Sequence, residues 1–163
     1  MKIGVGLDTN RPVDSVVADA ERVGEAGFEF VTSSHIFGYD AVTLLGIIGS
    51  RVPGPELMTA VVPIYSRHPL ALAQQALTVQ AATGGRFVLG IGLSHKVMIE
   101  NVYGLSFDHP LRAMREYLAA LMPLLHRQPV QFSGETLSVM SGPLEVDCEP
   151  PPVVVAALGP AML

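Results

Sequence analysis

At 163 residues the chain is long enough for one domain with a sizeable core. Hydrophobic residues make up 49% of it and charged residues only 15%, so we expect the apolar excess to lie in a core or beneath another chain. The net charge of -5 and the lack of a basic stripe argue against a nucleic-acid partner.

Cysteine usage and the amino-terminal sequence indicate a compartment. The single cysteine, Cys148, cannot form an internal disulfide, which is typical of the reducing cytoplasm. Met1 and Lys2 lead directly into a short apolar run, so we expect no signal peptide. No apolar run approaches the roughly 20 residues of a membrane helix. We therefore predict a cytoplasmic protein without a membrane partner.

Short apolar runs alternate with stretches of helical periodicity along the chain. Strands are predicted to begin near positions 3, 30, 58, 87 and 153. The first three steps are each under 30 residues, the length of one βα unit. This repeat predicts a parallel α/β sheet.

Further features follow from local signals. Residues 57–63 read as one continuous strand. Pro69 and Pro110 suit the first turns of two helices, and Asp108 is expected to cap the second. Alternating residues around Ser133-Gly134-Glu135 predict a small hairpin at about 130–140, outside the main sheet.

The stretch GGRFVLGIGLSH at residues 84–95 is predicted to form the fourth strand of the sheet and the loop that follows it. Its apolar run does not alternate, which is typical of a parallel strand buried on both faces. The two glycines within the run predict that another group approaches its backbone closely. Small and polar residues at its carboxyl end suit a site built where strands end.

Two architectures fit this order of elements. Five parallel strands make a complete doubly wound sheet, or they are the first five units of an eight-unit barrel, which takes roughly 250 residues. The chain stops at Leu163, one turn into a predicted helix, so we interpret it as the first part of a barrel.

Four motifs occur in order: SSH at 33–35, RHP at 67–69, GGRFVLGIG at 84–92 and AALGP at 156–160. With these motifs the whole chain resembles the luciferase-like monooxygenase superfamily, and within it the deazaflavin-dependent oxidoreductases. The resemblance implies a TIM (β/α)8 barrel of the bacterial-luciferase type. Residues 1–163 would be its amino-terminal portion, an incomplete barrel of five βα units without the carboxyl half.

The resemblance also implies a cofactor across the carboxyl ends of the strands: the deazaflavin coenzyme F420, or FMN as the alternative. It implies a cis bond without proline between Ala60 and Val61. The residues that match cofactor-contacting positions of the family are Ser34, Ala60, Val61, Leu93, Ser94, Leu158 and Gly159.

Two histidines are the candidate catalytic residues. Hydride transfer needs alignment, exclusion of water and one proton donor, and histidine suits the donor because its ordinary pKa is about 6.5. His35 matches an acid/base histidine of sugar-phosphate dehydrogenase relatives, and the alternative for it is a loop histidine bonded to backbone. His95 stands where those relatives have glutamate, which argues against sugar-phosphate chemistry. His68 is expected to be structural, and no spacing indicates a metal site.

Three functions are therefore weighed. The first is an oxidoreductase that passes a hydride to a small-molecule substrate and that forms a homodimer. The second is a non-catalytic half-barrel that self-associates, because its first and last strands have open edges. The third, a flavodoxin-like electron carrier, ranks last because Asp8-Thr9-Asn10 does not resemble a phosphate cradle.

Overall fold

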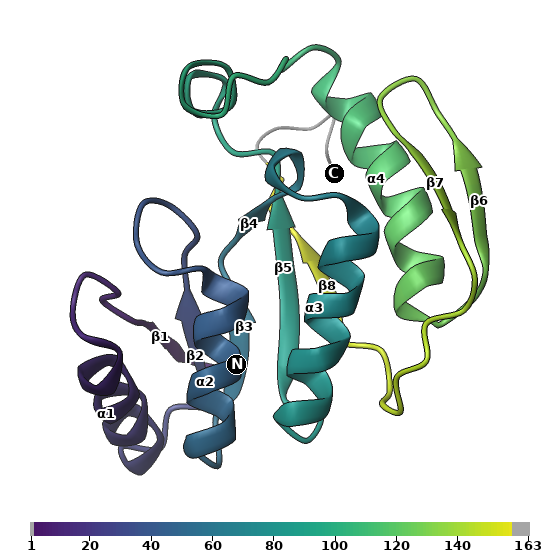
Figure 1. Cartoon of the computed structure of the whole chain (residues 1–163). Coiled ribbons are helices and arrows are strands. Elements are labelled where there is room, and N and C mark those ends of the chain that lie inside the picture. The colour runs from purple at the N-terminus through teal and green to yellow at the C-terminus, as the bar shows by residue number, and fades with distance from the viewer. Residues whose placement is uncertain (1, 158–163) are drawn as a thin grey trace.

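The computed structural model describes residues 2–157, in which strands and helices alternate as far as α4 (Figure 1). The helices are α1 (Val13–Glu25), α2 (Ala41–Arg51), α3 (Pro69–Ala82) and α4 (Pro110–Leu125), with short turns η1 (Ile64–Ser66) and η2 (Met98–Val102). The strands are β1 (Gly4–Gly6), β2 (Phe30–Ser33), β3 (Glu56–Thr59), β4 (Val62–Pro63), β5 (Phe87–Gly92), β6 (Val130–Ser133), β7 (Ser138–Ser141) and β8 (Val153–Val155).

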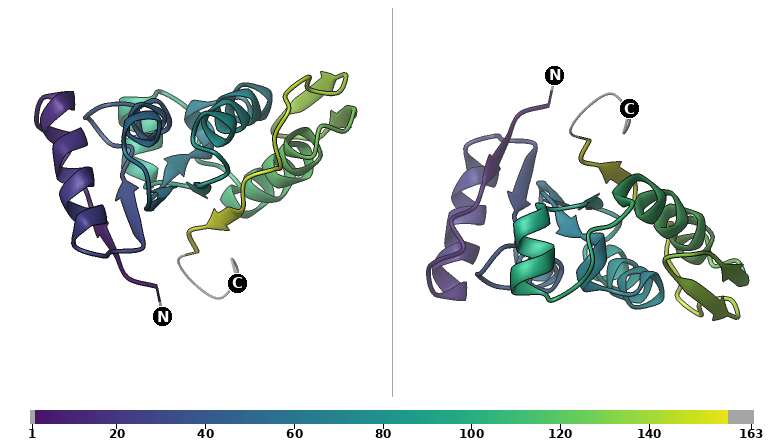
Figure 2. Two further views of the ribbon diagram at one scale, coloured as in Figure 1. Left: turned by 90° about the horizontal axis from the view of Figure 1, so that it is seen from below. Right: turned by 90° about the horizontal axis from the view of Figure 1, so that it is seen from above.

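The main sheet is parallel and its strands follow the order of the chain. β1 lies beside β2, β2 beside β3, both β3 and β4 beside β5, and β8 on the other side of β5. Right-handed crossovers that always advance in one direction place every helix on the same face. Figure 2 shows this arrangement, with the strands as an open arc and the helices on its outer side. This order matches the predicted barrel type and not a doubly wound sheet, in which the direction reverses.

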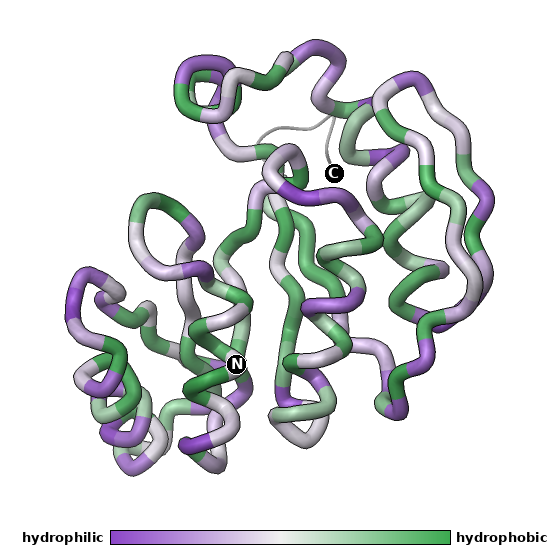
Figure 3. The backbone as a smooth tube through the Cα atoms, in the orientation of Figure 1, coloured by the Kyte–Doolittle hydropathy of each residue, from purple (hydrophilic) through white to green (hydrophobic). Residues whose placement is uncertain are grey.

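The core lies between the strands and the helix layer. Alternate residues of β5, namely Phe87, Leu89 and Ile91, are fully buried against the helices. Hydrophobic stretches accordingly run through the middle of the molecule, and hydrophilic residues gather at turns and helix ends (Figure 3). No helix within residues 2–157 is long and apolar enough to cross a membrane. Within residues 2–157, four helices each follow strands of the main sheet, and β8 adds a further parallel strand beside β5.

The predicted hairpin is confirmed. β6 and β7 pair antiparallel, apart from the main sheet, and lie beside α4 (Figure 1). The carboxylate of Glu116 on α4 holds the turn between them. It accepts hydrogen bonds from the Thr136 amide at 2.8 Å, the Thr136 hydroxyl at 2.6 Å and the Glu135 amide at 3.1 Å.

The two prolines start helices as predicted, but one capping prediction is wrong. Pro69 begins α3, and the His68 ring accepts a hydrogen bond from the Leu70 amide at 3.3 Å, a structural role. Pro110 begins α4, but the residue before it, His109, adopts a left-handed conformation and makes no side-chain cap. Asp108 instead accepts a hydrogen bond from the Ser106 hydroxyl at 2.6 Å, so it is turned toward its own loop.

The prediction of one continuous strand over 57–63 is also wrong, because a bulge divides β3 from β4. Met58 pairs with Val88 and Val62 with Ile91, so four steps on one strand match three on its neighbour. Such an extra residue is a β-bulge. The Ala60–Val61 peptide bond in the bulge is cis, as the family resemblance implies.

The bulge explains the glycines of β5. A Cβ added at Gly90 would overlap the Thr59 carbonyl, and one at Gly92 would lie 2.7 Å from a methyl of Val61. The close approach predicted for this strand therefore comes from the neighbouring strand. The Thr59 hydroxyl joins the two: it donates to the Gly90 carbonyl at 2.8 Å and accepts from the Gly90 amide at 2.7 Å.

The arginine of the same motif has a structural role at the opposite edge of the sheet. The Arg86 guanidinium donates to the carbonyls of Pro55 at 2.8 Å, Gly49 at 2.7 Å and Val52 at 3.1 Å, and its Nε donates to Thr83 at 3.0 Å. It thereby joins the carboxyl ends of α2 and α3, where a cation is favourable.

We expect Gly90→Ala to lower the free energy of unfolding by about 2 kcal/mol or more, because the new methyl group meets rigid backbone. Gly142→Ala is the matched control, since a Cβ there meets nothing within 4 Å. Urea denaturation of both variants measures the difference. Equal stabilities would show that β3 yields to the added methyl group.

Candidate functional site

The carboxyl edge of the sheet brings together several residues singled out in the sequence. The Ser34 hydroxyl donates to the Ala60 carbonyl at 3.0 Å, which joins the end of β2 to the bulge after β3. Ser34 is exposed, and Ala60 and Val61 are half-buried. These three residues therefore form one accessible surface, as expected for neighbouring ends of parallel strands.

His35 lies beside a charged pair that the sequence reasoning did not anticipate. Its Nδ1 is 3.5 Å from a carboxylate oxygen of Asp40, and the Arg67 guanidinium binds that same oxygen. Asp40 also caps α2, because its other oxygen accepts the Thr43 amide at 2.8 Å. The side chains of His35 and Arg67 are only 15% and 14% exposed, so the cluster is largely shielded from water.

The surroundings of His35 favour its neutral form. Burial, and then the positive charge of Arg67, lower its pKa from the ordinary value of 6.5. The Ala41 amide donates to Nδ1 at 3.4 Å, which leaves the proton of the neutral ring on Nε2. A neutral imidazole that carries its hydrogen on Nε2 can donate a hydrogen bond from that atom, and it can transfer a proton only after it has itself been protonated.

The end of β5 supplies a second group of predicted residues. Leu93 and Ser94 are half-buried, and Ser94 has a left-handed backbone with φ 63°. His95 is exposed, and its carbonyl accepts the amides of Met98 at 2.9 Å and Ile99 at 3.1 Å, so it starts the turn that leads into η2. The structure thus gives His95 a role in the loop through its backbone. Leu158 and Gly159 lie outside the described residues.

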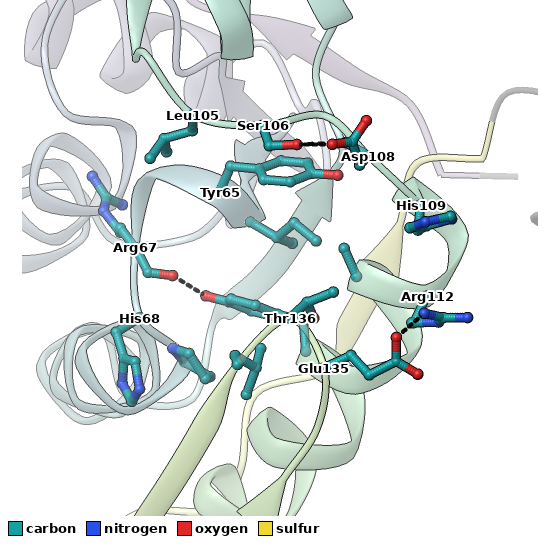
Figure 4. A pocket seen from close by; sticks show the side chains of 15 residues that line it. Tyr65, Arg67, His68, Leu105, Ser106, Asp108, His109, Arg112, Glu135 and Thr136 are labelled. Carbon is teal, nitrogen blue, oxygen red and sulfur yellow. Dashed lines mark hydrogen bonds and ion pairs between the residues drawn. The ribbon is translucent and has the colours of Figure 1, made fainter.

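A cavity of about 590 Å³ opens next to this edge, and the sequence reasoning missed it (Figure 4). It lies between η1, the segment that leads into α4, and the turn of the hairpin. Of the lining residues, Arg67 alone also belongs to the cluster around His35. The cavity could not be predicted from the sequence, because its wall depends on how the hairpin folds onto α4. Among residues 2–157 no group of three potential ligands is placed to hold a metal.

The arrangement around His35 leads to a prediction about its protonation. Arg67→Met removes the nearby positive charge and frees Asp40 to attract a proton, so the pKa of His35 should rise toward its ordinary value. Titration of the imidazole signals by NMR measures the shift.

Because the pKa is lowered in the folded chain, the unfolded state binds this proton first, and stability should fall as the pH drops below about 6.5.

The control for this prediction is Arg112→Met. Arg112 pairs with Glu135 on the hairpin and is not part of the cluster around His35. The pKa of His35 should be the same in this variant as in the original chain. An unchanged pKa in Arg67→Met as well would contradict the electrostatic role given to Arg67.

Comparison with known proteins identifies the chain's relatives. The family described as "Luciferase-like monooxygenase" matches residues 1–163. A Mycobacterium tuberculosis protein with the provisional name of coenzyme F420-dependent oxidoreductase is 33% identical over 162 residues, which cover 89% of this chain and 45% of that protein.

Solved structures show the same fold. The coenzyme F420 dependent tetrahydromethanopterin reductase of Methanopyrus kandleri superposes with a TM-score of 0.83 at 22% identity, over 99% of this chain and 51% of that one. The EDTA monooxygenase of Chelativorans sp. gives a TM-score of 0.88 at 18% identity, over 99% and 50%. The chain thus spans about half the length of the relatives that it matches.

Proposed function

Because the chain belongs to the luciferase-like monooxygenase family, we propose that it forms the amino-terminal part of a redox site. In this site a hydride passes between coenzyme F420 and a small organic substrate. FMN is the alternative cofactor. A relative with 33% identity is named for coenzyme F420, which favours the deazaflavin. The cytoplasmic location expected from the single cysteine stays a prediction.

The observation that carries this proposal is the juxtaposition at the carboxyl edge. Ser34 and the bulge at Ala60 and Val61 form a surface of small side chains, and Leu93 and Ser94 are half-buried at the end of β5. Small side chains around a backbone bulge fit a broad planar ring, because they leave its face unobstructed. The residues proposed to hold the cofactor are therefore Ser34, Ala60, Val61, Leu93 and Ser94, with Leu158 and Gly159 as expected from the sequence.

The chain's own contribution to the chemistry is the handling of one proton. A bound deazaflavin would supply the hydride, and the protein would supply alignment and a proton. We assign this role to His35, whose Nε2 would hydrogen-bond the reacting oxygen of the substrate and would give it a proton when the ring is in its imidazolium form. The Ala41 amide orients the ring, and burial and the charge of Arg67 favour its neutral form. His95 is a second candidate for the same role, since its exposed side chain follows the carboxyl end of β5, which lies on the other side of β3 from β2.

Titration of the 163-residue chain with coenzyme F420 and with FMN tests the proposal. Binding should change the fluorescence of the deazaflavin. Ser34→Phe should weaken that binding about tenfold or more, because the new ring covers the surface beside Ala60. Ser50→Phe is the matched control: Ser50 is also exposed and also donates to a backbone carbonyl, at 2.9 Å, but on α2. No binding of either cofactor would overturn the proposal.

A self-associating module is the second candidate function. Within residues 2–157, β1 and β8 each pair with one strand only, and Ile3 and Val154 beside those edges are 53% and 46% exposed. Open parallel edges of this kind attract further strands. Sedimentation at several concentrations should then show reversible dimers. A concentration-independent monomer would contradict this candidate and the predicted homodimer.

A further inference from the structure

The cavity beside α4 has the size and lining of a small-molecule site. Its volume of about 590 Å³ falls in the range of ligand pockets, roughly 300–1,000 Å³. Its apolar wall comes from five segments: η1, the start of α3, the approach to α4, α4 itself and the hairpin turn. The apolar lining residues are Ile64, Pro69, Leu105, Ala113 and Leu137.

The charged side chains around the cavity are already paired. Arg112 binds Glu135 (Figure 4), and Asp108 accepts a hydrogen bond from the Ser106 hydroxyl. Arg67 binds Asp40 through Nη2, and its buried Nη1 has no hydrogen-bond partner among the described residues, but in Figure 4 the guanidinium points away from the cavity. A charged ligand would have to displace one of these partners, so the lining favours an uncharged molecule.

Besides Nη1 of Arg67, one further polar group of the lining residues has no partner. The Tyr65 hydroxyl is buried and has no hydrogen-bond partner among the described residues. Its ring is fixed against Phe107, with ring centres 5.4 Å apart, and Figure 4 shows it along the upper wall. Burial, and then the charge of Asp108, raise the pKa of Tyr65, so the hydroxyl stays a donor. An unpaired buried hydroxyl is costly, whereas one that meets an acceptor is not.

The other tyrosine of the cavity shows the contrast. The Tyr117 hydroxyl donates to the Arg67 carbonyl at 3.0 Å, so its hydrogen-bonding capacity is used within the protein. Tyr65 is therefore the single tyrosine of the lining whose hydroxyl is free to bind a guest, among the residues that the structure describes. A ligand would need one hydrogen-bond acceptor near the Tyr65 hydroxyl and an apolar surface elsewhere.

We propose that this cavity binds an uncharged, mainly apolar organic molecule with one hydrogen-bond acceptor, such as an aromatic ketone, and that the Tyr65 hydroxyl holds the acceptor. The site is separate from the surface formed by Ser34, Ala60 and Val61. Ligand binding at this site requires no redox cofactor, so this proposal can be tested independently of the proposed function.

Two probes of matched shape test the role of the hydroxyl. Acetophenone has a carbonyl acceptor, and ethylbenzene is nearly the same shape without one. Amide shifts in NMR titrations of the 163-residue chain should locate both at the cavity, with acetophenone bound about fivefold more tightly. In Tyr65→Phe this preference should disappear, whereas ethylbenzene should bind as before.

Two further variants serve as controls. Tyr39→Phe removes an exposed hydroxyl outside the cavity and should leave the preference intact. Ala113→Leu places a larger side chain in the wall and should weaken both probes. Shifts confined to residues outside the cavity, or a preference for acetophenone that survives in Tyr65→Phe, would overturn the proposal.

Discussion

The extra residue between β3 and β4 is the constraint on which the carboxyl edge depends. At this point the register with β5 shifts by one residue. The Thr59 hydroxyl forms hydrogen bonds with both the amide and the carbonyl of Gly90. Only glycine fits opposite, because a Cβ at position 90 would overlap the Thr59 carbonyl. The bulge also turns the Ala60 carbonyl out of the ladder, where Ser34 donates to it. One local irregularity therefore joins three strands at their carboxyl ends.

A second constraint acts through the carboxylate of Asp40. It caps α2 and binds Arg67, so both of its oxygens are engaged before His35 is considered. An isolated carboxylate 3.5 Å from an imidazole would stabilise the protonated ring. Here burial and the charge of Arg67 outweigh that attraction, and the pKa of His35 falls. The cluster thus holds the histidine in place without charging it.

Much of this fold was predictable because the signals are local. The βα spacing, the prolines that begin α3 and α4, and the hairpin all follow from residues close together in the chain. The pairing of Asp40 with Arg67 was not predictable, because 27 residues separate them and only the register of the strands brings them together. The same holds for the cavity, whose wall forms when Glu116 fixes the hairpin turn. The resemblance to a family supplied the cis bond, which no local pattern indicates.

The side chains on the open face of the sheet bear on the choice between a redox site and simple self-association. Deep in this face lie larger half-buried residues: Met58 and Val88, which share register, and Phe30, which pairs with Glu56 two residues before Met58. Toward the carboxyl edge they give way to Ala60 and Gly92, and a Cβ at Gly92 would lie 3.4 Å from that of Ala156. A face that served only to self-associate would gain from large apolar side chains along its whole length. A gradient from large to small is instead what a barrel needs when side chains fill its interior and a ligand lies above them.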